Sequence, residues 1–191
     1  MSTATTLERD TEPEERPLFE AGYELVDGVW LERNMGTKVS EISSELRGEM
    51  THHNRRHRLG HVVDGDTAFV YPALANGRRR HPDAAFFRND QVPNGDLPDG
   101  WATFPAALVV EVVSPHNTAD ELERKITEWL NGGVECVWVV FPEARHVAVR
   151  YPDRRSLILY ETDTLDGEDV FPGFRMKVAS IFPPFPRDET E

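Results

Sequence analysis

The fold is decided by residues 106–141, AALVVEVVSPHNTADELERKITEWLNGGVECVWVVF, which combine strand, helix and strand patterns in one stretch. Ala106–Val113 is apolar at every position except Glu111, as is typical of a strand that is covered on both faces. Glu135–Pro142 is a second short, β-branched apolar run. The segment therefore predicts two buried strands of one sheet, connected by a helix that packs on that sheet.

The helix between these strands has recognisable ends. Thr118 can cap its first turn, and Glu121, three residues later, completes a capping box. Asn131 and the two glycines that follow it end the helical pattern. We therefore predict a helix that starts after Thr118 and stops near Asn131.

The rest of the chain supplies further strands and one more helix. Asp27-Gly28 lies between two short strand-like runs and predicts a hairpin. Apolar residues at helical spacing predict a helix from Thr37 to about Arg58. Further strands, a second hairpin and a closing strand and turn are predicted at about 61–71, 82–87, 146–161 and 168–186. The order predicts an α/β (α+β) domain with a central mixed sheet flanked by helices.

Composition places the chain among globular proteins with one domain. Of its 191 residues, 39% are hydrophobic and 29% charged. We expect one domain at 18–183, between disordered tails at 1–17 and 184–191, because both tails are polar, acidic and contain proline. No apolar run is long enough to span a bilayer, and no secretory signal is evident, so we expect a cytoplasmic protein without a membrane partner. The net charge of −13 argues against a nucleic-acid partner but does not exclude one.

Glu111 is the unusual residue of the buried strand. Val109, Glu111 and Val113 point to one face of an extended chain, and both faces are apolar. An isolated carboxylate in such a place costs several kcal/mol. A cationic partner, a bound metal or protonation would each relieve that cost, and a structural ion pair is the simplest of these arrangements.

Asp83 is a second acid at the start of an apolar strand, in RRRHPDAAFF, residues 78–87. If this strand lies beside the Glu111 strand, the two carboxylates can converge at one end of the sheet. Two such oxygen ligands suit Mg²⁺, which accepts one or two carboxylates and retains several waters. Alternatively, Asp83 is a turn residue that follows a proline.

A lysine is available on the helix after Thr118. Lys125 lies on one side of the apolar stripe and Glu123 on the other, so periodicity alone does not distinguish them. Lys125 can extend to solvent as a surface residue, or it can direct its ammonium group toward the carboxylates.

These features together resemble the Uma2 family of restriction-type endonucleases, within the PD-(D/E)xK nuclease superfamily. The resemblance spans roughly residues 22–182, and its most specific part is the pattern VVEVVSP, a lysine, GV and VWVV. The family implies a core ordered α-β-β-β-α-β, with added hairpins in this chain. The segments that carry the resemblance are YELVDG, HPDAAFF, residues 108–150 and TDTLDGEDVFPGFRMKVASIF.

The resemblance also implies a metal site and a reaction. Asp83 and Glu111 would hold Mg²⁺ (or Mn²⁺), with the Val112 carbonyl as a further ligand. The superfamily's strand lysine is replaced here by Val113, so the family resemblance assigns the lysine to Lys125 on the following helix. The implied activity is metal-dependent endonuclease hydrolysis of phosphodiester bonds in nucleic acid, with DNA as the expected substrate.

Other charged residues are candidates for supporting roles. Many superfamily members use an acid on the first helix, for which Glu41 and Glu45 are the candidates. Arg55, Arg56, Arg58 and the Arg78–Arg80 run could neutralise flanking phosphates, or could form solvated basic surfaces.

Three alternatives remain open. His53, His57 and His61 have helical spacing and could bind Zn²⁺ if one helix carried all three, although Gly60 is expected to end the helix first. The domain could retain the nuclease fold but act as an interaction or regulatory module. A homodimer is possible in either case, and no sequence feature fixes its interface.

Overall fold

The structure, a computed structural model, describes residues 22–33, 36–71 and 78–183. The tails predicted at 1–17 and 184–191 lie outside the described residues. No described helix is long and apolar enough to cross a membrane. The helices and strands are β1 Tyr23–Val26, β2 Val29–Glu32, α1 Thr37–His57, β3 Gly60–Asp64, β4 Ala84–Arg88, β5 Leu108–Val112, α2 Ala119–Asn131, β6 Cys136–Phe141, β7 His146–Arg150, β8 Ser156–Tyr160, β9 Thr164–Asp166 and β10 Arg175–Lys177.

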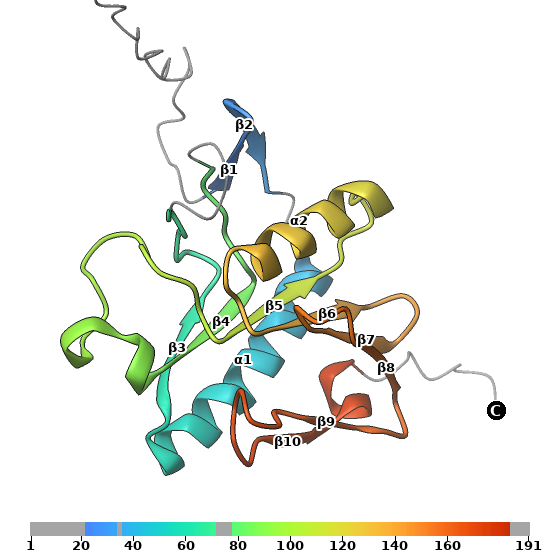
Figure 1. Cartoon of the computed structure of the whole chain (residues 1–191). Coiled ribbons are helices and arrows are strands. Elements are labelled where there is room, and N and C mark those ends of the chain that lie inside the picture. The colour runs from blue at the N-terminus through green and yellow to red at the C-terminus, as the bar shows by residue number, and fades with distance from the viewer. Residues whose placement is uncertain (1–21, 34–35, 72–77, 184–191) are drawn as a thin grey trace, which may run out of the picture.

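Six strands form the central sheet in the order β3-β4-β5-β6-β7-β8 (Figure 1). Only β5 and β6 run parallel within it, and the other neighbouring pairs are antiparallel. Parallel neighbours need a crossover connection, and α2 supplies it. This arrangement confirms the predicted mixed sheet and the predicted strand, helix and strand at residues 106–141.

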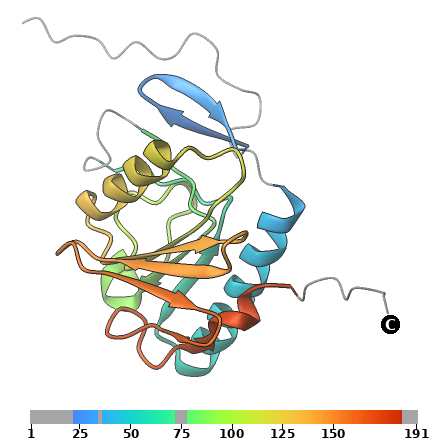
Figure 2. The same ribbon diagram turned by 90° about the vertical axis from the view of Figure 1, so that its right-hand side faces the viewer.

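The two helices cover opposite faces of the sheet (Figure 2). Leu108, Val110 and Val112 belong to the apolar core under α1. Val109 belongs to the core under α2, so Glu111, two residues later, points to the α2 side. A strand covered on both faces reads as a continuous apolar run, which explains the composition of β5.

Helix α1 begins and ends as its sequence predicts. Val39, Ile42, Leu46 and Met50 are all buried against the sheet. The helix stops at Arg58, which adopts a left-handed conformation with φ 53°. Gly60 then starts β3, where a Cβ atom would lie 1.9 Å from the Phe87 carbonyl oxygen, so only glycine fits this close strand approach.

Two short segments differ from the prediction. The strand expected at 61–71 stops at Asp64, because a turn follows in which Asp66 N–H donates to Asp64 Oδ1 at 3.2 Å. Phe69 then forms only isolated bridges, to Arg80 and Ala102. Strand β9, which pairs with β10, was not predicted because three residues are too few to show a period.

Candidate functional site

Asp83 and Glu111 lie next to each other at the end of two neighbouring strands. Ala84 pairs with Val110, which places Asp83 just before β4 and beside the end of β5. Asp83 Oδ2 accepts a hydrogen bond from the Val112 N–H at 2.6 Å. Both acids are buried. The predicted convergence of the two carboxylates is therefore present.

Lys125 points from α2 toward these acids. Its Nζ lies 2.8 Å from Glu111 Oε2, and it also donates to the His81 carbonyl oxygen at 3.2 Å. The interpretation of Lys125 as a solvated surface residue is therefore wrong, whereas Glu123, on the other side of the stripe, is exposed and bonds to Arg150.

Trp129 completes the surroundings of Glu111. Residues four apart lie on one face of a helix, so Lys125 and Trp129 reach the same carboxylate. Trp129 Nε1 donates to Glu111 Oε1 at 2.7 Å, while Lys125 contacts the other oxygen. In the sequence, Trp129 lies on the apolar stripe of the helix, and its ring gives no sign of a polar contact.

Glu24 on β1 is a third buried acid at the site, and sequence reasoning missed it. Its Oε1 lies 2.9 Å from Lys125 Nζ and accepts the His81 N–H at 3.0 Å. Its Oε2 accepts from Arg80 Nη1 at 2.8 Å. The only signal was an acid between Tyr23 and Leu25 in a strand pattern, some 87 positions before Glu111.

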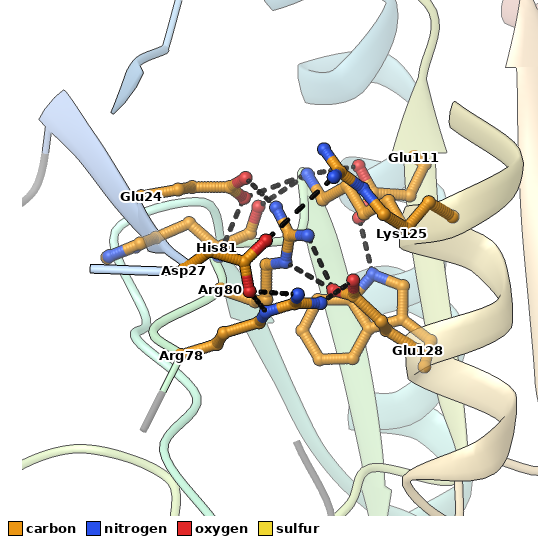
Figure 3. Close-up of polar contacts among 10 residues, drawn as sticks. Glu24, Asp27, Arg78, Arg80, His81, Glu111, Lys125 and Glu128 are labelled. Carbon is orange, nitrogen blue, oxygen red and sulfur yellow. Dashed lines mark hydrogen bonds and ion pairs between the residues drawn. The ribbon is translucent and has the colours of Figure 1, made fainter. Parts of the chain in front are cut away.

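Two arginines of the run before Asp83, Arg78 and Arg80, point toward carboxylates of the site (Figure 3). Arg80 is buried, and its Nε donates to Glu128 Oε2 at 2.9 Å. Arg78 bonds both Glu128 and Asp27. Neither predicted role, flanking-phosphate contact or solvated basic surface, fits Arg78 and Arg80, because their guanidinium groups are held by carboxylates. Arg79 differs, because its guanidinium carbon lies over the Trp101 ring, 4.2 Å from the ring centroid.

The acids of the first helix do not reach the site. Glu41 and Glu45 are exposed on α1 and do not line the cleft described below. From α1, Val39 lines the cleft, and Ser43 Oγ donates to the Asp83 carbonyl oxygen at 3.2 Å. The third acid of the site therefore comes from the N-terminal hairpin rather than from the first helix.

These residues line a cleft of about 390 Å³ between the hairpin, the sheet end and α2. Its rim includes Ser114, His116 and Asn117 from the loop that leads into α2. The charged side chains among its described lining residues are acidic Glu24, Glu32, Asp83, Glu111 and Glu121 and basic Arg33, Arg80, Arg124 and Lys125. With all of them ionised, the lining carries one net negative charge.

Positive charge is concentrated around Glu24. Burial works to raise the pKa of Glu24, but Lys125 and Arg80 outweigh it and lower the pKa to about 2. Burial also works to lower the pKa of Lys125, but the carboxylates around it, led by Glu111 and Glu24, raise it to about 12. Glu24 and Lys125 are therefore both ionised near neutral pH.

Asp83 and Glu111 are less well compensated. Burial raises the pKa of Glu111 to about 7 despite Lys125, and the nearby charges of Asp83 and Glu24 add to the rise. Burial likewise raises the pKa of Asp83, against the opposing effects of Lys125 and of the Val112 N–H. Two adjacent carboxyl groups thus have less positive charge near them than full ionisation requires.

This donor set fits a hard divalent cation. Asp83 Oδ1 lies 3.7 Å from Arg33 Nη2, too far for a hydrogen bond, and each carboxylate oxygen has two lone pairs. Among the described residues, no three His, Cys, Asp or Glu side chains form a metal-binding group. A cation here would therefore rest on Asp83 and Glu111 and complete its shell with water or backbone oxygen, as Mg²⁺ does.

The histidine alternative is wrong. His53 contacts the Pro172 carbonyl oxygen at 3.0 Å and packs against the tilted ring of His57, with ring centroids 4.4 Å apart. His61 lies on β3, beyond the end of α1, as Gly60 predicts. Within the described part of the chain, these histidines form no metal-binding group.

Comparisons with known proteins agree with this architecture. A family model described as "Uma2: Putative restriction endonuclease" matches residues 17–179. A crystal structure from Anabaena variabilis ATCC 29413, described as "a putative nuclease belonging to DUF820", has a TM-score of 0.75 and 16% identity, over 87% of this chain and 92% of that one. At that identity the likeness shows the fold. No curated protein matches the chain.

Proposed function

The chain belongs to the Uma2 family, and from this premise we propose that it is a divalent-metal-dependent endonuclease whose site is the cleft at Asp83, Glu111 and Lys125. The observation that carries the proposal is the pair of buried, adjacent carboxyl groups with raised pKa values. Such a pair is costly when both groups are ionised, and a cation bound between them would relieve that cost.

Asp83 and Glu111 would hold Mg²⁺ or Mn²⁺, with the Val112 carbonyl as a further candidate ligand. When bound, the cation supplies Lewis-acid polarisation of a phosphate oxygen and makes a water easier to deprotonate. It would also change the net charge of the cleft lining from −1 to +1. A phosphodiester anion is therefore attracted to the loaded cleft and repelled from the empty one.

Lys125 acts as a fixed positive charge and not as a base. Its raised pKa of about 12 keeps the ammonium group protonated throughout the neutral range. Glu24 and the His81 carbonyl hold it in place, so its direction does not depend on substrate. From there Lys125 would stabilise negative charge that develops on the phosphate. Lys125 thus takes the role of the superfamily's strand lysine, whose place is occupied by Val113.

The substrate class is nucleic acid, and we propose DNA. Arg55, Arg56 and Arg58 are exposed near the C-terminal end of α1, whereas Val39, near its other end, lines the cleft. At 1.5 Å per residue, Val39 and Arg55 are separated by roughly 24 Å along the helix. Only a polymer could contact both places at once, so these arginines are candidates for distant backbone phosphates.

The test is cleavage of supercoiled plasmid, single-stranded DNA and RNA by the purified protein with Mg²⁺, with Mn²⁺ and with EDTA. We expect metal-dependent nicking by the wild type and none by Asp83→Ala or Lys125→Ala. Glu41→Ala and Glu45→Ala are matched controls, because they remove exposed acids that lie away from the cleft. Both controls should cleave like the wild type.

Two results would contradict the proposal. Cleavage that persists in Asp83→Ala and Lys125→Ala would come from a contaminant or from another site. Absence of cleavage of every nucleic acid, by folded wild-type protein with either metal, would favour the interaction module that keeps the nuclease fold.

A further inference from the structure

The outermost strand of the sheet, β8, has one unpaired side. The strand order ends at β8, and no described strand pairs with its outer edge. Leu157, Ile158 and Tyr160 are 39%, 54% and 57% exposed. β8 contains neither lysine nor proline, the residues that often protect a sheet edge from pairing. It is therefore an apolar edge that can pair with another strand.

The backbone of β8 offers free hydrogen-bonding groups at Ile158. Tyr151 N–H donates to the Arg155 carbonyl oxygen at 3.1 Å, in line with the β7–β8 register. Bonded pairs alternate in an antiparallel ladder, so Leu157 and Leu159 turn their polar groups toward β7 and Ile158 turns its groups outward. Tyr160 follows this alternation, because its N–H points away from β7 and donates to Asp163 Oδ2, beyond the strand, at 2.8 Å.

The sequence of this strand is complementary to itself in the antiparallel direction. Residues 155–161 read RSLILYE, with Ile158 at the centre. About a twofold axis at Ile158, each Leu157 faces a Leu159, and each Arg155 faces a Glu161 of the second copy. The two leucine pairs and the central isoleucine pair are apolar, and the flanking pairs have opposite charge.

We propose that β8 pairs antiparallel with β8 of a second copy of this chain and joins two six-stranded sheets into one. The central isoleucines exchange two N–H···O bonds, and the leucine pairs beside them contribute side-chain contacts. Asp163 already bonds both the N–H and the carbonyl oxygen of Tyr160, at 2.8 Å each, which confines the backbone pairing to the middle of the strand. The proposal does not depend on the nuclease activity, because two strands separate β8 from β5 in the sheet.

The flanking charges support a second copy as the occupant. Arg155 and Glu161 remain 50% and 39% exposed, although each also has a partner in its own chain, Glu168 and Arg145. Both can therefore accept a further partner of opposite charge. A foreign strand would have to carry the same charges in reverse order, whereas a twofold axis provides them automatically.

The first test is the mass in solution by light scattering of the full-length protein. We expect twice the chain mass of 21.7 kDa for the wild type and the single mass for Ile158→Lys, which places two lysines face to face at the axis. Val29→Lys is the matched control, because Val29 is 57% exposed on another strand, β2. It should remain dimeric.

Disulfide trapping tests the register. Bonded antiparallel pairs have Cα atoms about 5.5 Å apart, within the range for a disulfide. Ile158→Cys should therefore cross-link to itself on mild oxidation. Tyr160→Cys alone should not, but should cross-link when mixed with Ser156→Cys. The native Cys136 is buried and should not react.

Several results would overturn the proposal. The proposal is wrong if the wild type stays monomeric at its highest soluble concentration. It is also wrong if the Ile158→Lys variant remains dimeric. Cross-linking of Val29→Cys as readily as Ile158→Cys would indicate a different interface. A monomer that becomes dimeric on deletion of residues 184–191 would show that the chain's own terminus covers β8.

Discussion

Glu24 and Glu111 are two buried carboxylates that share one lysine, yet their surroundings have opposite effects. Glu24 is held by Lys125, Arg80 and a backbone N–H, and its pKa falls to about 2. Glu111 has Lys125 and the indole of Trp129, lies beside Asp83, and its pKa rises to about 7. The protein therefore stabilises one charge fully and leaves the other short of a cation.

This difference separates structure from function within one cleft. The Glu24 side is complete, because its ion pairs connect the hairpin, the segment before β4 and α2. The Glu111 side is incomplete, which is expected of a site that binds a cation from solution. Substitutions on the first side should mainly change folding stability, whereas those on the second should mainly change metal response.

The largest effect is expected from Arg80→Ala. Removing this buried guanidinium breaks its ion pairs with Glu24 and Glu128, which keep only Lys125 and Arg78 as cationic partners, and breaking a buried pair costs about 3–5 kcal/mol. Urea unfolding at pH 7 measures this loss of unfolding free energy. The control is Arg175→Ala, which removes an exposed arginine paired with Asp166 and should cost less than about 1 kcal/mol. Equal losses in the two variants would mean that the Glu24 network contributes nothing special.

Glu111→Gln should raise the free energy of unfolding, whereas Arg80→Ala lowers it, and the gain should depend on pH. Glu111 has a folded pKa of about 7 against a usual value of 4.5, so the wild type loses stability as pH rises from 4.5 through 7. The amide removes that loss. In EDTA, the variant should gain roughly 2–3 kcal/mol relative to the wild type between pH 5 and pH 8.

Urea unfolding at several pH values checks the Glu111→Gln expectation. Glu41→Gln is the matched control, because it changes an exposed acid of the same type. A difference between Glu111→Gln and the wild type that stays constant with pH would show that the buried carboxylate is fully compensated without metal.

Trp129→Phe should have a smaller effect that is specific to Glu111. The ring is retained while the hydrogen bond to Glu111 Oε1 is lost, at about 1–3 kcal/mol. Because the lost bond favours the ionised carboxylate, the cost should be larger at pH 8 than at pH 5, where Glu111 is mostly protonated. The same cost at both values would indicate a packing defect alone.

The smallest expected effect is that of metal on the melting temperature. At ten times its Kd, Mg²⁺ or Mn²⁺ should stabilise the wild type by about 1.4 kcal/mol, or roughly 3–6 °C. Glu111→Ala should show no shift. Glu41→Ala should respond like the wild type. The same response in Glu111→Ala and the wild type would place the metal elsewhere.

Sequence reasoning found the half of the site that lies close together along the chain. Asp83 lies just before β4, Glu111 lies on β5 and Lys125 lies on α2, and the order and pairing of these elements follow from buried apolar runs and one well-capped helix. The burial of a single acid in β5 indicated that something must compensate it. The apolar spacing from Thr37 to about Arg58 likewise predicts α1.

The other half of the site depends on how the N-terminal hairpin docks on the domain. No local sequence period encodes that docking. Glu24 reaches the site because Leu25 bridges to Arg79 and turns Arg80 inward. An arginine run looks basic and solvated in a sequence, and only the docked hairpin shows that its charges are neutralised. Trp129 was likewise hidden, because one polar atom on a core ring has no sequence signature.

The most direct test of the central claim is a crystal of the protein soaked in Mn²⁺, with anomalous scattering to locate the ion. We predict a peak that contacts both Asp83 and Glu111, and no such peak in Glu111→Ala crystals. A fully soaked crystal without a peak at this pair, or with the ion bound at Glu24 instead, would contradict the account.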